Sequence, residues 1–304
     1  MQSTPPTVAA VVREQTHLSW SRARKLCTDG RVTVDGKRCL DPAERVPEGA
    51  VVVVDLQGPK QPAGPLSREA ILFFDRDVVI VDKPAGMLSV PDVPGNKDTL
   101  GVHARTLLRR MGAEDTALAV VHRLDKDTSG PMAFARTATA QRALAAQFRD
   151  HEVDRVYQAI AHGTVAAARV ETYLIPDRGD GLRGSYGHYK RATGDPPAIA
   201  RRAITVLSPL ASLKGATLVE CRLETGRQHQ IRIHLSELGH PLAGERVYIR
   251  DYTGAKIESP RPMLHAQTLG FLHPRTGKHV LFQREPPADF QAMLERLQTK
   301  SGSG

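Results

Sequence analysis

The chain has 304 residues, of which 40% are hydrophobic, and a formal net charge of +9 at pH 7. This length is enough for two domains, and the apolar content is enough for a packed core. The excess of Lys and Arg is typical either of a soluble basic protein or of one that binds a polyanion, because clustered cations release counterions from phosphates.

The three cysteines, Cys27, Cys39 and Cys221, are too few and too scattered for a disulfide framework. They form no cluster with histidines at the spacing of a zinc site, so we expect no metal. The N-terminus lacks the basic and apolar regions of a signal peptide, and no apolar run is long enough to span a bilayer. These features predict a cytoplasmic protein that works without a membrane.

A small α/β unit is predicted over residues 1–56. Its stretch THLSWSRARKLCTDG, residues 16–30, combines polar capping residues with helix formers, and its last glycine is a good helix stop. The next residues, RVTVDGKRCL, are predicted to form a hairpin whose turn carries Asp35 and Gly36. A further strand follows in VPEGAVVVVD.

The order of these elements resembles the alpha-L RNA-binding module (ribosomal protein S four-like), over roughly residues 8–55. Clustered cations on a short helix are often only a solvated face. The resemblance implies instead that the helix and hairpin hold structured RNA. The basic residues expected to contact it are Arg22, Arg24, Lys25 and Lys37.

A linker is predicted over residues 57–68, within the stretch LQGPKQPAGPLS. Its prolines remove backbone donors and its glycines disfavour regular structure. A larger domain is predicted over residues 69–300.

In the larger domain, two apolar runs on either side of residues 75–77 predict a strand hairpin, and the segment after residue 100 has helical spacing. A second helix is predicted over residues 137–151, with Thr137 as its cap and an apolar stripe of Ala140, Leu144 and Phe148. Strands are predicted in VDRVYQAIAHG and TLVECRLETG. Because strands outnumber long helices and do not alternate with them, an α+β fold is favoured over a doubly wound sheet.

The segment RQHQIRIHLSELGHP, residues 227–241, fits either a helix or a strand. We favour a helix, because Ile231, Leu235 and Leu238 have helical spacing and Gly239 can end it.

Residues 178–200 form a long glycine-rich stretch. It is equally well interpreted as a surface insertion or as a loop that contacts RNA through charge and stacking. Its candidate contacts are Arg178, Arg183, Tyr186, Tyr189, Lys190 and Arg191.

The stretch VHRLDKDTSG, residues 121–130, places Asp125 between Arg123 and Lys126. A nearby arginine favours an ionised carboxylate and lowers its pKa, which suits a nucleophile or a base. The alternative is a structural salt bridge in a turn, which is the common fate of such a pair.

The same stretch resembles the signature of the RluA-type pseudouridine synthases. Further blocks match this family in the right order: DKPAGMLSVP at 82–91, RVYQAI at 155–160 and LETGRQHQIRIHLSELGHPLAGERVY at 223–248. The resemblance covers nearly all of residues 70–290. It implies a mixed, mainly antiparallel curved sheet with flanking helices, and an isomerase of RNA uridines.

The resemblance also implies roles for individual residues. Asp125 is the catalytic aspartate, and Arg123 is expected either to enter the RNA stack or to hold the flipped-out position. Tyr157 stacks on the uracil and assists proton removal from C5. Arg227 is expected to pair with Asp125, and Arg232 is expected to contact RNA.

Pseudouridine forms when the N1–C1′ bond of uridine breaks and C5 joins C1′. Nothing is oxidised or reduced, so no cofactor is expected. The aspartate either attacks C1′ or removes a proton from C2′, and the sequence does not decide between these routes. The family pattern is altered mildly at three positions: Arg155, Gln228 and Glu245.

Two other functions remain open at this point. A non-catalytic RNA-binding or ribosome-assembly protein would suit the basic charge and the N-terminal module equally well. A glycoside hydrolase using Asp125 and Asp127 is much weaker, because the pair does not supply carboxylates on both sides of a sugar. We expect a monomer that acts on RNA, with ribosomal RNA preferred over transfer RNA.

Overall fold

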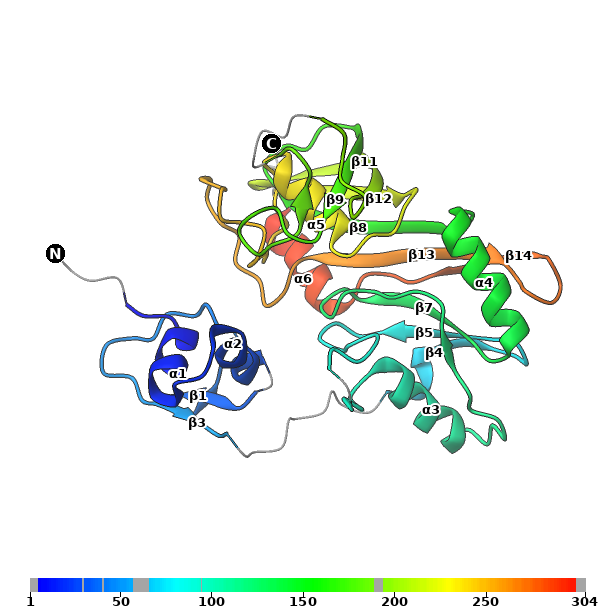
Figure 1. Cartoon of the computed structure of the whole chain (residues 1–304), viewed down its shortest axis with the longest axis horizontal. Helices are drawn as coiled ribbons and strands as arrows, with labels where there is room; N and C mark the ends of the chain where they lie inside the picture. The colour runs from blue at the N-terminus through cyan, green and yellow to red at the C-terminus, as the bar shows by residue number, and fades with distance from the viewer. Residues whose placement is uncertain are drawn as a thin grey trace, which may run out of the picture. The chain divides into compact units, whose positions relative to one another are not determined.

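The computed structural model describes residues 5–28, 30–39, 41–56, 66–93, 95–188 and 194–298 (Figure 1). The chain divides into two compact units, residues 1–64 and 65–304. This division falls inside the predicted linker, most of which lies outside the described residues. In the described parts of both units, every helix is too short or too polar to cross a membrane.

The N-terminal unit contains two helices and a small sheet. Its helices are α1 (Val8–Thr16) and α2 (Trp20–Thr28), and its strands are β1 (Val32–Val34), β2 (Lys37–Arg38) and β3 (Val52–Val54). The sheet is antiparallel with the order β2-β1-β3. The predicted helix, hairpin and strand are therefore confirmed.

Two local features explain these elements. The β1–β2 turn has positive φ at both Asp35 (50°) and Gly36 (75°), which matches the right-handed twist of the two strands. The sequence predicts one helix here, but the described residues of this unit form two. The additional helix α1 begins after Thr7, whose hydroxyl accepts a hydrogen bond from the backbone N–H of Ala10 at 3.2 Å.

The larger unit contains two antiparallel sheets. The four-stranded sheet has the order β4-β5-β7-β6 and consists of β4 (Ile71–Phe74), β5 (Val78–Lys83), β6 (Ala119–Val120) and β7 (Gly130–Ala135). The seven-stranded sheet has the order β10-β9-β11-β12-β8-β13-β14. Its strands are β8 (Asp154–His162), β9 (Ala168–Ile175), β10 (Gly184–Ser185), β11 (Arg201–Leu213), β12 (Ala216–Leu223), β13 (Leu264–Leu272) and β14 (His279–Gln283).

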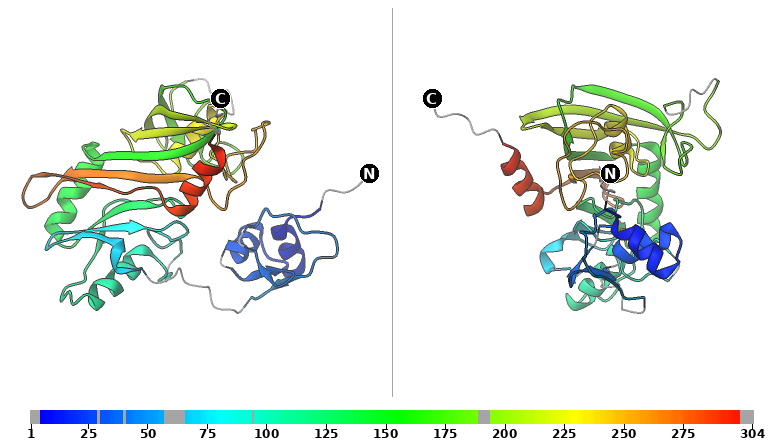
Figure 2. Two further views of the ribbon diagram at one scale, coloured as in Figure 1. Left: turned by 180° about the vertical axis from the view of Figure 1, so that it is seen from behind. Right: turned by 90° about the vertical axis from the view of Figure 1, so that its left-hand side faces the viewer.

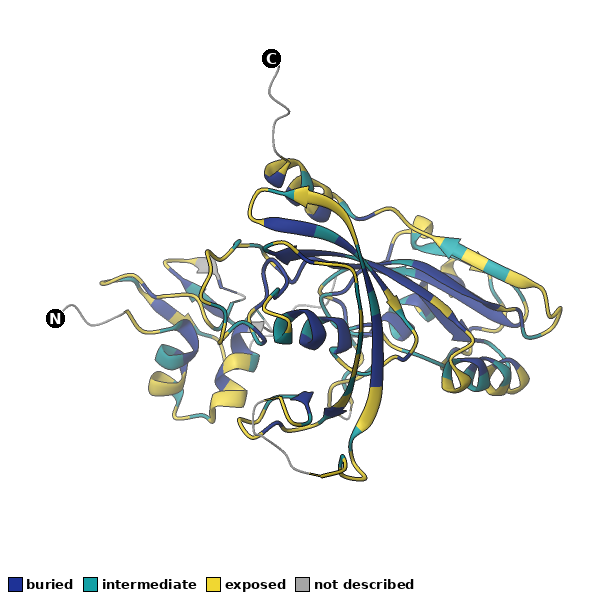
Figure 3. Cartoon of the chain, turned by 90° about the horizontal axis from the view of Figure 1, so that it is seen from above, coloured by how far each residue is buried: buried dark blue, intermediate teal, exposed yellow. Residues whose placement is uncertain are grey.

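Helices flank these sheets, and the predicted α+β fold with mainly antiparallel strands is confirmed. The helical elements are the 3₁₀ turn η1 (Arg68–Ala70), α3 (Leu100–Arg110), α4 (Ala138–Asp150), α5 (Gln230–Glu237) and α6 (Ala288–Leu297). Figure 2 shows the orange strand β13 beside the green strand β8, as their pairing requires. The central strands of the large sheet are mostly buried, as Figure 3 shows.

The two sheets meet where the start of β7 approaches β13. Ser129 forms a parallel bridge with His265, and its carbonyl accepts a hydrogen bond from the backbone N–H of Ala266 at 2.8 Å. Gly130 has φ 119°, and a Cβ at this position would overlap the carbonyl oxygen of Ala266. Only glycine therefore allows the backbones to approach this closely.

Helix α4 follows its predicted cap and apolar stripe. Thr137 accepts a hydrogen bond from the N–H of Ala140 at 3.1 Å. Ala140 and Leu144 are buried against the sheets, and Phe148 is partly buried beside them.

Helix α5 is also confirmed, but its buried face differs in part from the prediction. Ile231 and Leu235 are buried, whereas Leu238 is 45% exposed. The helix ends at Glu237, so Leu238 lies beyond the last helical residue and does not continue the apolar stripe. Gly239 follows with φ 85° and allows the chain to turn away.

Candidate active site

Asp125 lies in the loop between β6 and β7, and this loop is fixed by side chains from elsewhere. The Ser89 hydroxyl donates to the carbonyl of Leu124 at 2.6 Å and accepts from the N–H of the same residue at 3.1 Å. Asp125 and Thr128 close a turn through a 3.1 Å backbone hydrogen bond. The carboxylate is therefore presented by a rigid backbone and not by a free loop.

Lys83, at the end of β5, fixes the same loop through hydrogen bonds to its backbone. Its side chain is fully buried, and its ammonium donates to the carbonyls of Pro84, Lys126 and Thr128 at 3.0, 2.7 and 2.8 Å. Burial lowers the pKa of Lys83 to about 7, although Asp127 and Asp125 oppose this shift. The lysine closes the turn that carries Asp125.

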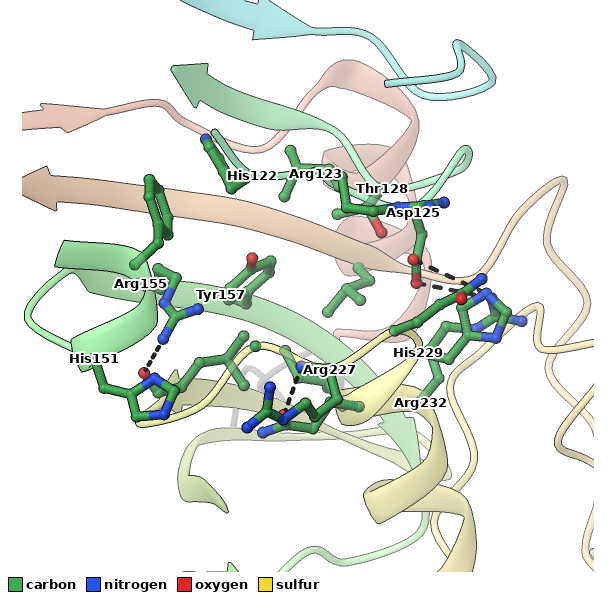
Figure 4. A pocket seen from close by; sticks show the side chains of 18 of the residues that line it. His122, Arg123, Asp125, Thr128, His151, Arg155, Tyr157, Arg227, His229 and Arg232 are labelled. Carbon is green, nitrogen blue, oxygen red and sulfur yellow. Dashed lines mark hydrogen bonds and ion pairs between the residues drawn. The ribbon is translucent and has the colours of Figure 1, made fainter. Parts of the chain in front are cut away.

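Two basic side chains face the Asp125 carboxylate (Figure 4). One Oδ lies 4.0 Å from Nη1 of Arg232, and the other lies 3.9 Å from Nε2 of His229. The Asp125 side chain is only 17% exposed, so these charges are poorly screened by water.

Arg232 is held in place by a second, buried carboxylate. Its guanidinium donates to both oxygens of Glu245, at 2.8 and 2.6 Å, and lies 5.3 Å from the centre of the Tyr248 ring. Burial raises the pKa of Glu245, but the hydrogen bonds and charge of Arg232 outweigh this and keep the pKa below its usual value. Glu245 therefore orients the cation that faces Asp125.

His229 contacts the same group of residues. Its Nδ1 lies 2.7 Å from the hydroxyl of Tyr248. Burial lowers the pKa of His229 despite the nearby Asp125, which favours the neutral ring at pH 7. Neither His229 nor Tyr248 is a candidate from the sequence, since their proximity to Asp125 depends on how α5 packs.

Tyr157 and Arg155 project from β8 into the same pocket as Asp125, because alternate residues of a strand share a face. The pocket has a volume of about 370 Å³, within the usual range for small-molecule sites of about 300–1,000 Å³. The Tyr157 side chain is buried, which raises the pKa of its hydroxyl to about 12. The phenol is therefore neutral at pH 7.

Arg227 lines the pocket, but the predicted pairing with Asp125 is wrong. Its Nε donates to the backbone carbonyl of Arg202 at 3.0 Å, and the cation near Asp125 is Arg232. Arg227 precedes α5, whereas Arg232 lies within the helix on its inward side. The motif contains both arginines, and only the helix geometry distinguishes them.

The other predicted RNA contacts are distributed over both units. Arg123 is exposed at the pocket wall. On α2, Arg22 and Arg24 are exposed, and the Arg24 guanidinium lies 5.9 Å from the centre of the Trp20 ring. Lys25 is half-buried, and the side chain of Lys37 lies outside the described part of the structure.

The described residues of the glycine-rich segment, 178–188 and 194–200, are buried to different degrees. Arg178 is buried and donates to both oxygens of Asp180 at 3.1 Å, so its prediction as an RNA contact is wrong. Arg183 and Tyr186 are half-buried, and Tyr189, Lys190 and Arg191 lie outside the described residues. The short strand β10 ties the segment to β9.

Comparison with known families divides the chain as the two units do. Residues 77–237 match the family described as RNA pseudouridylate synthase. Residues 11–52 match the S4 domain.

Several curated relatives align with this chain over most of their length. The chain is 37% identical to ribosomal large subunit pseudouridine synthase D of Zymomonas mobilis, over 93% of this chain and 90% of that protein. It is 33% identical to an uncharacterised RNA pseudouridine synthase of Bacillus subtilis, over 93% and 91%. It is also 33% identical to ribosomal large subunit pseudouridine synthase D of Pseudomonas aeruginosa, over 92% and 88%.

A solved structure shares the fold of the larger unit. Human RNA Pseudouridylate Synthase Domain Containing 4 superposes with a TM-score of 0.60 at 22% identity, over 75% of this chain and 93% of that one. This likeness supports the fold assignment alone.

Proposed function

The chain belongs to the RNA pseudouridylate synthase family, and from this premise we propose that it isomerises uridine to pseudouridine in RNA of the large ribosomal subunit. The observation that carries the proposal is Asp125, held in a pocket beside Arg232 and opposite a buried tyrosine, Tyr157. Two relatives that align along most of the chain are named for the large ribosomal subunit, which supports this RNA over transfer RNA.

The target uridine must leave its stack to reach this pocket, which costs a few kcal/mol. In our proposal the Tyr157 ring stacks on the extruded uracil and offsets part of that cost. Arg123, exposed at the rim, fills the space in the RNA stack that the base has left.

Asp125 then acts on the ribose of the extruded nucleotide. Its carboxylate either forms a bond to C1′ or removes a proton from C2′, and in both routes the N1–C1′ bond breaks. The uracil turns within the pocket and C5 bonds to C1′, while the carboxylate leaves C1′ or returns the proton to C2′. The C5 proton is then lost and N1 takes up a proton, so the nucleotide keeps its composition. Since the bonds rearrange without a net change in oxidation state, the proposed reaction needs no redox cofactor.

The neighbours of Asp125 support this role. Arg232 places a positive charge 4.0 Å from the Asp125 carboxylate, and Glu245 prevents the guanidinium from turning away. The pKa of Tyr157, about 12, keeps its hydroxyl protonated. Tyr157 could therefore accept the C5 proton only by giving its own hydroxyl proton to a second group.

The N-terminal unit suits a role in holding the RNA outside the pocket. Its helix α2 presents Arg22 and Arg24 to solvent beside the half-exposed ring of Trp20. Cations bind phosphates, and an aromatic ring can stack on an unpaired base.

This unit also favours the second candidate function, RNA binding without catalysis. Incubation with large-subunit ribosomal RNA transcribed in vitro, followed by chemical mapping of pseudouridine, separates the two. We expect marks with wild type and none with Asp125→Ala. Absence of marks with wild type, despite binding, would support the RNA-binding alternative, whereas identical marks with both proteins would refute the role of Asp125.

A further inference from the structure

Arg155, on β8, is a buried cation that the mechanism above does not use. Its side chain is 9% exposed, and its Nη2 reaches the carbonyls of Leu223 and Glu224 only at 3.5 and 3.3 Å. Its Nε is buried and has no hydrogen-bond partner among the described residues. A buried donor without a partner costs free energy, so its retention calls for an explanation.

The local structure keeps space for this guanidinium. A Cβ at Gly226 would overlap Nη1 of Arg155, so a glycine at this position leaves room for the head group. The ring of Phe148 lies beneath it, 5.9 Å from the guanidinium carbon. In Figure 4, Arg155 lies between Tyr157 and His151.

A second cavity, of about 530 Å³, adjoins the pocket of Asp125. The two cavities share His151, Arg155, Leu223 and Arg227 in their walls. Arg155 and Arg227 therefore lie between the cavity that holds the catalytic carboxylate and a space beside it.

These two arginines differ from the other two arginines that line the second cavity. Arg202 pairs with Glu171 at 2.6 Å, and Arg222 pairs with Glu220 at 2.9 Å. Within the described residues, Arg155 and Arg227 form no ion pair with a carboxylate. Burial lowers the pKa of His151, and the charges of Arg155 and Arg227 lower it further. The wall between the cavities is thus positively charged without an internal counterion.

We propose that Arg155 and Arg227 together bind a backbone phosphate of the RNA, namely one next to the extruded uridine. This inference rests on the proposed function. A flipped nucleotide rotates about its backbone, so the base enters the pocket while the adjoining phosphates stay at its wall. Guanidinium groups match phosphate oxygens in geometry and charge, and a bound phosphate would supply the counterion that Arg155 and Arg227 lack.

The test compares Arg155→Met and Arg227→Met with Arg222→Met. Arg222 is a control arginine that lines the second cavity only and is already paired with Glu220. The rate constant kcat/KM for pseudouridine formation is measured on an in vitro transcript of large-subunit ribosomal RNA at several salt concentrations. We expect each test variant to lose about 10-fold to about 100-fold at low salt. Its plot of log kcat/KM against log salt should be less steep by about 0.7–0.9, the value for one lost phosphate contact.

Thermal unfolding without RNA gives a readout that a merely structural role would not give. Because Arg155 is buried with an unsatisfied donor, Arg155→Met should unfold at the same or a higher temperature than wild type while losing activity. A structural role predicts a lower unfolding temperature and an unchanged salt slope.

The outcomes separate this inference from the function on which it rests. An active wild type whose test variants keep the salt slope of Arg222→Met overturns the phosphate site alone. A wild type that binds the transcript but forms no pseudouridine overturns the proposed function, and the phosphate site with it.

Discussion

The buried pair between Arg232 and Glu245 makes a prediction whose magnitude follows from the structure. The substitution Glu245→Gln removes the negative charge from a pair with contacts of 2.6 and 2.8 Å, in which the Glu245 side chain is fully buried. Breaking a buried pair leaves an uncompensated charge and costs about 3–5 kcal/mol. The control Glu220→Gln breaks an exposed pair with Arg222 and should cost about 0–1 kcal/mol.

The assay is urea unfolding of the full chain, followed by circular dichroism and by tryptophan fluorescence. Trp20 is the single tryptophan of the chain and lies in the N-terminal unit, so its fluorescence reports that unit alone. We expect Glu245→Gln to lower the free energy of unfolding of the larger unit and to leave the Trp20 transition in place. A loss below about 1 kcal/mol, equal to the control, would refute the view that Glu245 anchors Arg232.

A double variant separates stability from activity at the same pair. Arg232→Met combined with Glu245→Leu replaces both buried ions with apolar side chains, which is often neutral for stability or even stabilising. Pseudouridine formation should nevertheless be lost, because the cation facing Asp125 is gone. An active double variant would contradict the role of Arg232.

Three further outcomes follow from the same structure. Since the pKa of Tyr157 is raised to about 12, its phenol should stay neutral between about pH 6 and about pH 9. The rate of pseudouridine formation in this range should therefore show no pH-dependent change that disappears in Tyr157→Phe. A change of that kind would contradict a neutral phenol. Gly130→Ala should destabilise the larger unit by at least about 3 kcal/mol in urea unfolding, because its Cβ would overlap the Ala266 carbonyl. The control Gly112→Ala, at φ 85° in open space, should cost about 1 kcal/mol. Equal losses in the two variants would refute the close approach of the backbones at Gly130. Deletion of residues 1–60 should weaken RNA binding and reduce its salt dependence while circular dichroism shows a folded catalytic unit, whereas an unchanged salt slope would count against RNA contact by the N-terminal unit.

Elements with strong local signals are predictable from the sequence. The Asp35 and Gly36 pair specifies its hairpin because both residues tolerate positive φ, and Thr137 specifies the start of α4 because its hydroxyl binds a free backbone N–H. Helix α1 has a comparable signal in Thr7, followed by the apolar Val8 and Val12, so the sequence could have revealed it.

The partners within the site are less predictable, because they depend on packing between distant segments. Asp125 is found from its motif, but the choice between Arg227 and Arg232 depends on which side of α5 faces the loop that carries Asp125. Glu245 is more than a hundred residues from Asp125 in the sequence. The structure relates the two because Arg232, on α5, lies close to both carboxylates. Arg178 shows the same limit, because a basic residue in a polar loop can turn inward to meet a carboxylate.

The most direct test of the account is the substitution Asp125→Asn, which keeps the shape of the side chain and removes its charge. Pseudouridine formation and RNA binding are measured on the same in vitro transcript of large-subunit ribosomal RNA. We expect the variant to bind the RNA without forming detectable pseudouridine. Pseudouridine at the wild-type rate would contradict a catalytic role for this carboxylate.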